Sequence, residues 1–258
     1  MIPHRKNALV TALFSRHAGS LLRKNFRKIS FTRASAAPEF EPGVPVVAIA
    51  NHSSWWDPLL ALVLSRSVFK KDAYGVMDEE QLRRYDIMRS IGVYSVNRDS
   101  NHEGRQFLEY TRGLLGGTGR LLWIYPQGEL ISSEELPLVF KKGFVQILKL
   151  FPRVQLLKMV ASYDFWIESK PEVVVDLLPL ETLVPQKTGS FSDALVARCQ
   201  KEMTDRLLEV RRIVRTRDAK ALRPLAVHAH GTHPVYDAYR RVRARVLGRE
   251  FRTSHGAE

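Results

Sequence analysis

The fold of this chain is decided by one stretch of sequence, VPVVAIA-NHSSWWDP-LLALVL, which runs from Val44 to Leu64. The apolar run from Val44 to Ala50 is typical of a strand that is buried on both faces. The following residues, Asn51 to Pro58, are predicted to form a loop, and the apolar run from Leu59 predicts a helix. A buried strand that leads through a polar loop into a helix is the repeating unit of α/β proteins.

The same alternation of elements continues along the chain. Strands are predicted over residues 92–96, 121–125, 154–160 and 173–178, and helices over 79–90, 103–115, 143–150 and 191–215. The sequence therefore predicts an α/β fold with a mixed, largely parallel sheet flanked by helices, preceded by an amphipathic helix at the amino terminus.

Composition excludes several classes of protein. The chain has 258 residues, of which 45% are hydrophobic and 26% are charged, as expected of a folded protein rather than a disordered one. Its longest apolar runs, such as Leu59 to Leu64, are far shorter than the roughly 18 residues that span a bilayer. With Cys199 as the single cysteine, the chain has no intrachain disulfide framework and no thiolate metal cluster.

The positive charge is concentrated at the two ends of the chain. The formal net charge is +13; residues 1–37 contain eight Lys and Arg and no acidic residue, whereas residues 211–258 contain twelve against four. Such ends are expected to meet an anionic partner.

A helix is predicted over residues 7–29, with an apolar and a basic face. The apolar residues at helical spacing are Val10, Leu13, Phe14, Ala18, Leu21, Leu22, Phe26 and Ile29. Such a helix suits the surface of a membrane with anionic lipids, where each basic residue contributes about 1 kcal/mol. The alternative is a helix that packs on its own domain with a solvated basic side.

His52 and Asp57 are candidate catalytic residues. A histidine can accept a proton from a hydroxyl group, and a carboxylate can orient its ring and stabilise the imidazolium. Both residues follow a predicted strand, at the edge of the sheet where α/β proteins bind ligands. The spacing is weak support by itself, because an aspartate before Pro58 is also a common start for a helix.

Further blocks follow this pair in a fixed order. They are Gly92-Val93-Tyr94-Ser95-Val96-Asn97-Arg98, Tyr125-Pro126-Gln127-Gly128-Glu129, Phe140-Lys141-Lys142-Gly143 and Leu178-Pro179-Leu180. Over about residues 40–185 the chain resembles the glycerolipid acyltransferases, the lysophosphatidate acyltransferase-like enzymes. Their blocks are N-H-x4-D, a glycine-to-arginine strand segment, F-P-E-G-T-R, a lysine–glycine segment and a late strand that contains proline.

The resemblance implies acyl transfer from acyl-CoA or acyl carrier protein to a hydroxyl group, without a metal, a cofactor or a covalent enzyme intermediate. His52 would deprotonate the acceptor and Asp57 would orient His52. Backbone N–H groups around Gly128 are candidates for stabilising the oxyanion, a contribution of roughly 2.7–4 kcal/mol for each donor.

Departures from the family pattern bear on the acceptor. The F-P-E-G-T-R block reads Tyr125 to Leu130 here, with Gln127 in place of the acid and Leu130 in place of the arginine. An expected upstream lysine corresponds to Met77 or Asp78, whereas Arg98 is retained. Because Glu129 also adds a negative charge, the expected acceptor is a lipidic hydroxyl and not a plain glycerol phosphate. Gln127 could instead bind a sugar-type hydroxyl or stabilise its loop.

Other residues near these blocks are candidates for substrate binding. Trp55 and Trp56 could line an acyl or acceptor pocket or anchor at a membrane interface, although core packing is the alternative for at least one of them. Lys141 and Lys142 could attract the phosphates of CoA or an acidic carrier protein, or lie on the surface as ordinary charges.

The resulting organisation has three parts. We expect residues 1–37 to be a basic segment that associates with a membrane, residues 38–215 to be the acyltransferase domain, and residues 216–258 to be a basic extension with a short helix at 235–247. The expected location is peripheral, at the cytoplasmic face of a membrane. The alternatives are a 1-acylglycerol-3-phosphate acyltransferase, a non-enzymatic peripheral membrane protein on a degenerate acyltransferase scaffold, and a thioesterase-like hydrolase.

Metal and nucleic-acid binding are weaker interpretations. His228, His230 and His233 have a spacing found in zinc sites, but they lack a nearby Asp or Cys and lie in a basic tail. A pI near 10 is compatible with nucleic-acid binding, but no nucleic-acid-binding motif is present. We therefore expect neither a metal nor a nucleic acid.

Overall fold

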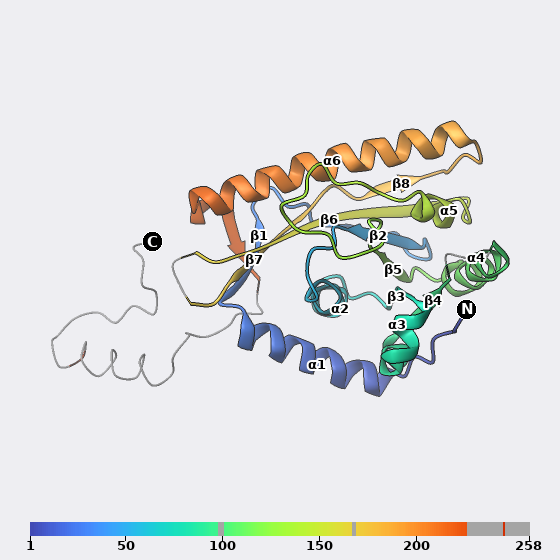
Figure 1. Cartoon of the computed structure of the whole chain (residues 1–258), viewed down its shortest axis with the longest axis horizontal. Helices are drawn as coiled ribbons and strands as arrows, with labels where there is room; N and C mark the ends of the chain where they lie inside the picture. The colour runs from blue at the N-terminus through green and yellow to red at the C-terminus, as the bar shows by residue number, and fades with distance from the viewer. Residues whose placement is uncertain (98–100, 167–168, 226–244, 246–258) are drawn as a thin grey trace.

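The computed structural model describes residues 1–97, 101–166, 169–225 and 245. It confirms the predicted class: a mixed, largely parallel nine-stranded sheet is flanked by helices, and a helix lies at the amino terminus. In Figure 1, α6 runs along the top of the sheet and α1 along the bottom, so the sheet forms a middle layer. None of the helices in these described ranges combines the length and the hydropathy needed to cross a bilayer.

The central sheet has the strand order β4-β3-β5-β2-β6-β7-β1-β9, and β8 pairs with β6. The strands are β1 (Lys28–Thr32), β2 (Val46–Ala50), β3 (Ala73–Asp78), β4 (Val93–Val96), β5 (Leu121–Ile124), β6 (Val154–Asp164), β7 (Glu172–Leu177), β8 (Glu181–Leu183) and β9 (Leu222–Pro224). Strand β2 lies between β5 and β6 and runs parallel to both. Its carboxyl end, where the polar loop begins, is therefore near the middle of the sheet.

The helices cover both faces of this sheet. They are α1 (Ala8–Asn25), α2 (Asp57–Ser67), α3 (Glu79–Arg84), α4 (Asn101–Leu115), α5 (Gly143–Leu148) and α6 (Gly189–Thr216), with 3-10 turns at Asp86–Ile91 and Ala219–Ala221. Side chains of β2 alternate between the two faces: Val47 and Ile49 belong to one core cluster, and Ala48 and Ala50 to the other. A strand buried on both faces needs no polar residue, which explains its continuous apolar sequence.

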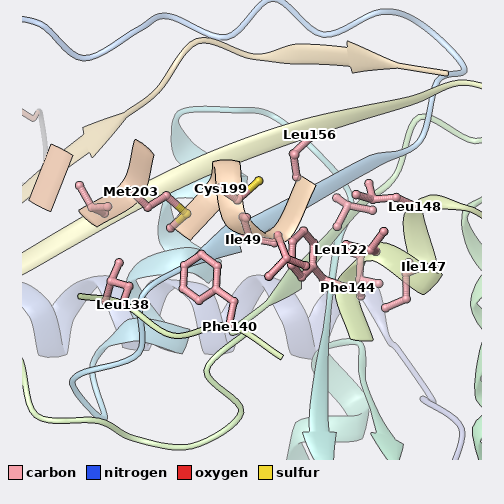
Figure 2. Packing of buried hydrophobic residues seen from close by; sticks show 14 of the residues in the cluster. Ile49, Leu122, Leu138, Phe140, Phe144, Ile147, Leu148, Leu156, Cys199 and Met203 are labelled. Atoms are coloured by element: carbon pink, nitrogen blue, oxygen red, sulfur yellow. The ribbon is translucent and has the colours of Figure 1, made fainter. Parts of the chain in front are cut away.

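One core lies between the sheet and helices α4, α5 and α6. Figure 2 shows its centre, where Ile49 of β2 and Leu122 of β5 meet Phe144 of α5 and Cys199 and Met203 of α6. The second core lies on the opposite face, where α1 and α2 pack together against the sheet. This second layer matters for the site, because α2 begins at Asp57.

Helix α1 packs on the domain through a face that its apolar residues predict only in part. Its buried residues are Thr11, Ser15, Ala18, Gly19 and Leu22, whereas Leu9 and Leu13 are 69% and 56% exposed. Small residues at helical spacing let α1 approach α2 closely. The predicted apolar face over residues 7–29 is therefore confirmed in part: Ala18, Leu22, Phe26 and Ile29 are buried, whereas Leu13 is exposed and small polar residues complete the buried face. The packed helix, which was the alternative, is the observed arrangement, and it leaves a second, outward face that carries leucines.

The amino-terminal helix is also shorter than predicted. It ends at Asn25, and residues 28–32 form β1, which pairs in parallel with β7 and antiparallel with β9. Ile29 and Phe31 of this strand join the core under α1, and Ser30 and Thr32 face the other way and are also buried. Strands of the sheet therefore come from the segments that sequence analysis placed before and after the acyltransferase domain. The helix predicted over 235–247 falls almost entirely outside the described residues.

Candidate active site

His52 and Asp57 lie side by side at the carboxyl end of β2. Nδ1 of His52 is 2.9 Å from Oδ2 of Asp57. The Asp57 side chain is 1% exposed and that of His52 is 18% exposed. Because a carboxylate only accepts hydrogen bonds, the proton of the neutral imidazole resides on Nδ1, and Nε2 is left as the basic atom. The geometry is that of a histidine oriented by a buried carboxylate.

Local sequence explains why the loop after β2 forms this pair. Oδ2 of Asp57 also accepts hydrogen bonds from the backbone N–H groups of Ser53 and Ser54, each at 2.9 Å. Asp57 is the first residue of α2, and Pro58 follows it, as is common at the start of a helix. The helix-start role and the histidine-orienting role of Asp57 thus coexist.

Asn51 anchors the other end of the loop to the sheet. Its side chain donates to the carbonyl of Ala161 at 3.0 Å and accepts from the N–H of Ala161 at 2.8 Å. Ala161 belongs to β6, the strand next to β2. This pair of hydrogen bonds continues the β2–β6 ladder by one residue, so His52 leaves the sheet from a fixed position.

Tyr163 is a site residue that sequence reasoning missed. Its hydroxyl donates to Oδ1 of Asp57 at 2.6 Å. Burial, reinforced by the negative charge of Asp57, raises the pKa of Tyr163 well above its usual range, so the hydroxyl keeps its proton and donates it. Asp57 therefore accepts hydrogen bonds on both oxygens. No local pattern marks Tyr163, because it lies 106 positions after Asp57 and reaches it through the pairing of β6 with β2.

Tyr125 packs against the imidazole ring of His52. Its ring stacks on the ring of His52, with centroids 4.3 Å apart and planes inclined by 23°. Its hydroxyl oxygen is buried and has no hydrogen-bond partner among the described residues. Burial, and secondarily the charge of Asp57, raises the pKa of Tyr125 well above its usual range. Tyr125 thus contributes its ring to the site, and its hydroxyl is unsatisfied.

The Gln127–Gly128 turn is bonded to the histidine loop. Oε1 of Gln127 accepts a hydrogen bond from the backbone N–H of His52 at 2.7 Å, and the N–H of Ile131 donates to the carbonyl of His52 at 2.9 Å. Gln127 is buried, which supports the loop-stabilising role for its side-chain oxygen. Gly128 has φ 85°, a conformation that favours glycine, and its N–H already donates to the carbonyl of Tyr125. That N–H is not free for an oxyanion.

The charged candidates lie on the surface around this turn. The carboxylate of Glu129 is 3.8 Å from Nζ of Lys141, and both side chains are well exposed. The backbone N–H of Lys141 donates to the carbonyl of Pro126, which ties Lys141 to the turn. Lys142 instead pairs with Asp193 at 2.6 Å. Of the two lysines, Lys141 is therefore the one connected to the site, and Lys142 is engaged by α6.

The two tryptophans have different environments. Trp56 is half-buried and packs edge-on against Phe26 of the core under α1, with ring centroids 5.0 Å apart. Trp55 is 62% exposed and contacts Trp56. Core packing therefore accounts for Trp56, and Trp55 remains available to a ligand or a membrane.

Some sequence candidates fall outside the described part of the chain. They are Arg98 and the histidines His228, His230 and His233. Among the residues that the structure does describe, no group of three or more His, Cys, Asp or Glu side chains could hold a metal ion. The site brings together His52, Asp57, Gln127, Gly128 and Glu129.

The sequence matches a known protein family over the part of the chain that contains this site. Residues 28–158, just over half of the chain, match the model of a family described as Acyltransferase. A similar solved structure is that of the 1-acyl-sn-glycerophosphate (LPA) acyltransferase, PlsC, from Thermotoga maritima. It has a TM-score of 0.48 and 15% sequence identity, with 76% of this chain and 78% of that chain covered. No curated protein matches the chain. The matched residues include the histidine–aspartate pair and the Tyr125 to Leu130 block.

Proposed function

This chain belongs to the acyltransferase family, and on that premise we propose that it transfers a fatty acyl group from acyl-CoA or acyl carrier protein to a hydroxyl group of a lipidic acceptor. The observation that carries the proposal is the contact of 2.9 Å between Nδ1 of His52 and the buried carboxylate of Asp57. It leaves Nε2 as the basic atom, in the protonation state that a general base requires.

The proposed reaction has two steps. Nε2 of His52 accepts the proton of the acceptor hydroxyl while the oxygen of that hydroxyl attacks the carbonyl carbon of the thioester. The tetrahedral intermediate then expels the thiolate, which takes the proton back from the imidazolium as thiol, and the ester remains on the acceptor. Asp57 stabilises the positive charge that forms on His52 between the two steps.

The oxyanion of this intermediate needs a hydrogen-bond donor. Because the N–H of Gly128 is engaged, we assign this role to the N–H of Glu129, for which the described residues provide no hydrogen-bond acceptor. Two residues further on, Ile131 bonds to the carbonyl of His52, so the turn lies beside the histidine. The N–H of Glu129 is one of the backbone N–H groups around Gly128 that the sequence suggested for this role.

The proposed acceptor lacks a phosphate next to the reacting hydroxyl. Leu130, at the position of the family's arginine, is 56% exposed and supplies no charge, and the Glu129 carboxylate would repel an anion. Lys141, which lies 3.8 Å from Glu129, compensates part of that charge. A neutral lipid or glycolipid hydroxyl meets these surroundings at lower cost than a phosphate dianion does.

A coupled assay tests the proposal. Purified protein is incubated with palmitoyl-CoA and either monoacylglycerol or lysophosphatidate, and both free thiol and acylated product are measured. Product formed from monoacylglycerol in proportion to thiol supports the proposal. Turnover confined to lysophosphatidate overturns the inferred acceptor but not acyl transfer. Thiol released without acylated lipid indicates hydrolysis, and no thiol release from palmitoyl-CoA or from palmitoyl-acyl carrier protein indicates a non-enzymatic scaffold.

The hydroxyl of Tyr163 provides a graded test of the site. Tyr163→Phe removes one of the hydrogen bonds to the buried Asp57 carboxylate, so the imidazole loses part of its orientation. We expect kcat to fall about tenfold, the equivalent of one hydrogen bond to a charged group. Because Tyr163 acts through Asp57, KM for the thioester should stay unchanged.

Tyr125→Phe is the matched control for this variant. It removes a hydroxyl that is buried but unpartnered, at a position where the family block has phenylalanine. We expect kcat to be unchanged and the melting temperature to be equal or higher, because a buried unsatisfied polar group is lost. Equal losses of kcat in both variants would contradict the positioning role of Tyr163.

We also propose that the outward face of α1 binds the surface of a membrane. Leu9 and Leu13 project from this face, and Arg16, Arg23 and Lys24 are exposed along the same helix. Apolar side chains flanked by cations suit the boundary between acyl chains and anionic headgroups. Deleting residues 1–30 is a poor test, because it would remove buried parts of α1 and most of β1.

Substitution of the outward leucines tests membrane binding directly. Leu9→Ser/Leu13→Ser should weaken binding to vesicles of anionic phospholipid by about tenfold or more, because burial of each leucine contributes roughly 1.5–3 kcal/mol. Sedimentation with vesicles measures the effect. Leu208→Ser is the control, since Leu208 is 49% exposed on α6 at the opposite face of the sheet (Figure 1). Unchanged sedimentation of the double variant would exclude this face as the contact.

A further inference from the structure

A basic cavity lies at the edge of the sheet opposite the site. Its volume is about 540 Å³, within the usual range for ligand pockets. It is lined by residues at the beginning of α1, the end of α2, the start of β3 and the residue that precedes β5. Because β2, β3 and β5 are parallel, this is the amino-terminal edge of the strands, whereas His52 follows the carboxyl end of β2. Neither His52 nor Asp57 lines the cavity.

Cations exceed anions in the lining of this cavity. The charged residues are Lys6, Arg66, Lys71 and Arg120 against the single carboxylate of Asp72, and His4 also contributes its ring. Burial lowers the pKa of Lys6, Lys71 and His4, and for Lys6 the positive charges of Arg120 and Arg66 add to this effect. The excess of positive charge rests on the residue types, four Lys and Arg side chains against one carboxylate, and burial acts against it.

Asp72 does not neutralise this surplus, because its carboxylate is already shared by three donors. Its carboxylate is 2.6 Å from Nζ of Lys6, 3.2 Å from Nε of Arg120 and 3.1 Å from the hydroxyl of Tyr74. Among the described residues, Nζ of Lys71 has one hydrogen-bond partner, the carbonyl of Gly119 at 3.2 Å, and it lies over the ring of Phe40.

Of the four cations in the lining, Arg66 and Lys71 are the two that form no ion pair with a carboxylate of the described residues. No ion pair joins either of them to another described residue. Arg66 is exposed and Lys71 is half-buried, so both can meet a ligand that enters from solvent. Cations that converge on a cavity without a counter-charge favour an anion of high charge density, and a phosphate group accepts several charged hydrogen bonds at once.

We infer that this cavity binds a phosphate group through Arg66 and Lys71, at a site separate from the one that contains His52. The phosphate can belong to a soluble molecule or to a lipid headgroup, because the cavity opens beside the start of α1, the helix whose outward face we propose to lie on a membrane. A ligand bound there holds the start of α1 against the end of α2. Since α2 begins with Asp57, the two sites are joined by one short helix.

The experiment uses full-length protein and two double variants of equal charge. Arg66→Gln/Lys71→Gln changes the cavity, and Lys70→Gln/Arg112→Gln is the control. Lys70 adjoins Lys71 in the sequence, and Lys70 and Arg112 are both exposed and outside the lining. Titration calorimetry with pyrophosphate measures the soluble source, and flotation with phosphatidylcholine vesicles, with and without phosphatidic acid, measures the lipid source.

We expect the cavity variant to weaken binding about tenfold or more relative to the control, because two charged hydrogen bonds are lost. Selective loss of pyrophosphate binding identifies a soluble phosphate ligand. Loss of phosphatidic acid-dependent vesicle binding, with pyrophosphate binding retained, identifies a lipid headgroup as the ligand. Equal binding by the two double variants in both assays overturns the inference.

Asp72→Asn is expected to raise the affinity that the cavity variant lowers. Damage to the fold cannot produce such an increase. Removing the carboxylate frees Lys6 and Arg120 and should tighten the binding that the cavity variant weakens. Weaker binding by Asp72→Asn, with an unchanged circular dichroism spectrum, would count against the site. None of these measurements requires acyl transfer, so the result is independent of the proposed function.

Discussion

His52→Ala is expected to lower kcat for acyl transfer by about 10³- to 10⁴-fold, since the variant has no group that can take the proton of the acceptor. The loss should fall on kcat, because no other contact with the thioester is removed. Thiol release and acylated product are measured together under saturating donor. The backbone contacts of His52 with Gln127 and Ile131 do not involve the ring, so the loop should keep its shape.

His102→Ala is the matched control for this variant. His102 is exposed on α4, where it contacts Gln106, and it is not part of the site. Its kcat should equal that of the unmodified protein. Circular dichroism and the melting temperature establish that His52→Ala is folded. A folded His52→Ala protein with undiminished turnover would remove the histidine from the mechanism and, with it, the proposed reaction.

The position of His52 and Asp57 was predictable because the information is local. An apolar strand ends, two serine N–H groups turn toward the carboxylate, and Pro58 begins a helix, all within one short segment. Tyr163 was not predictable, because its contact with Asp57 depends on the register between β2 and β6. Residues that complete a site from a distant strand leave no periodic signal in the sequence.

The same distinction explains the errors in the fold. Ile29 continues the apolar spacing of α1, so the predicted helix was extended to residue 29, although residues 28–32 pair with β7 and β9. Residues 73–78 form β3 at a position where Gly75 interrupts the apolar pattern. In both segments, pairing with neighbouring strands determines the structure, and local propensity does not.

The buried face of α1 shows a third limit. Thr11, Ser15 and Gly19 lie against the domain because they are small, which lets α1 and α2 come close, and hydropathy alone gives them no weight. The leucines that hydropathy assigned to the packed face include Leu13, which is 56% exposed. Interhelical distance, which depends on side-chain volume, selects the buried face here.

Asp57→Asn is expected to lower kcat by about 10²- to 10³-fold while leaving the site geometry intact. Oδ2 of Asp57 accepts from Nδ1 of His52 and from the N–H groups of Ser53 and Ser54, so an asparagine must place its carbonyl oxygen there and its NH₂ toward Tyr163. The Tyr163 hydroxyl can turn and accept, since a hydroxyl serves both roles.

The loss in Asp57→Asn therefore measures the negative charge and not the orientation of the ring. With the carbonyl oxygen held by two backbone donors, Nδ1 of His52 keeps its proton and Nε2 stays basic, but the imidazolium formed during the reaction has lost its counter-charge. Asp57→Ala removes both the negative charge and the orientation of the ring, so its kcat should be lower still. Equal rates for the two variants would mean that orientation contributes nothing, whereas a rate for Asp57→Asn equal to that of the unmodified protein would mean that the negative charge of Asp57 contributes nothing.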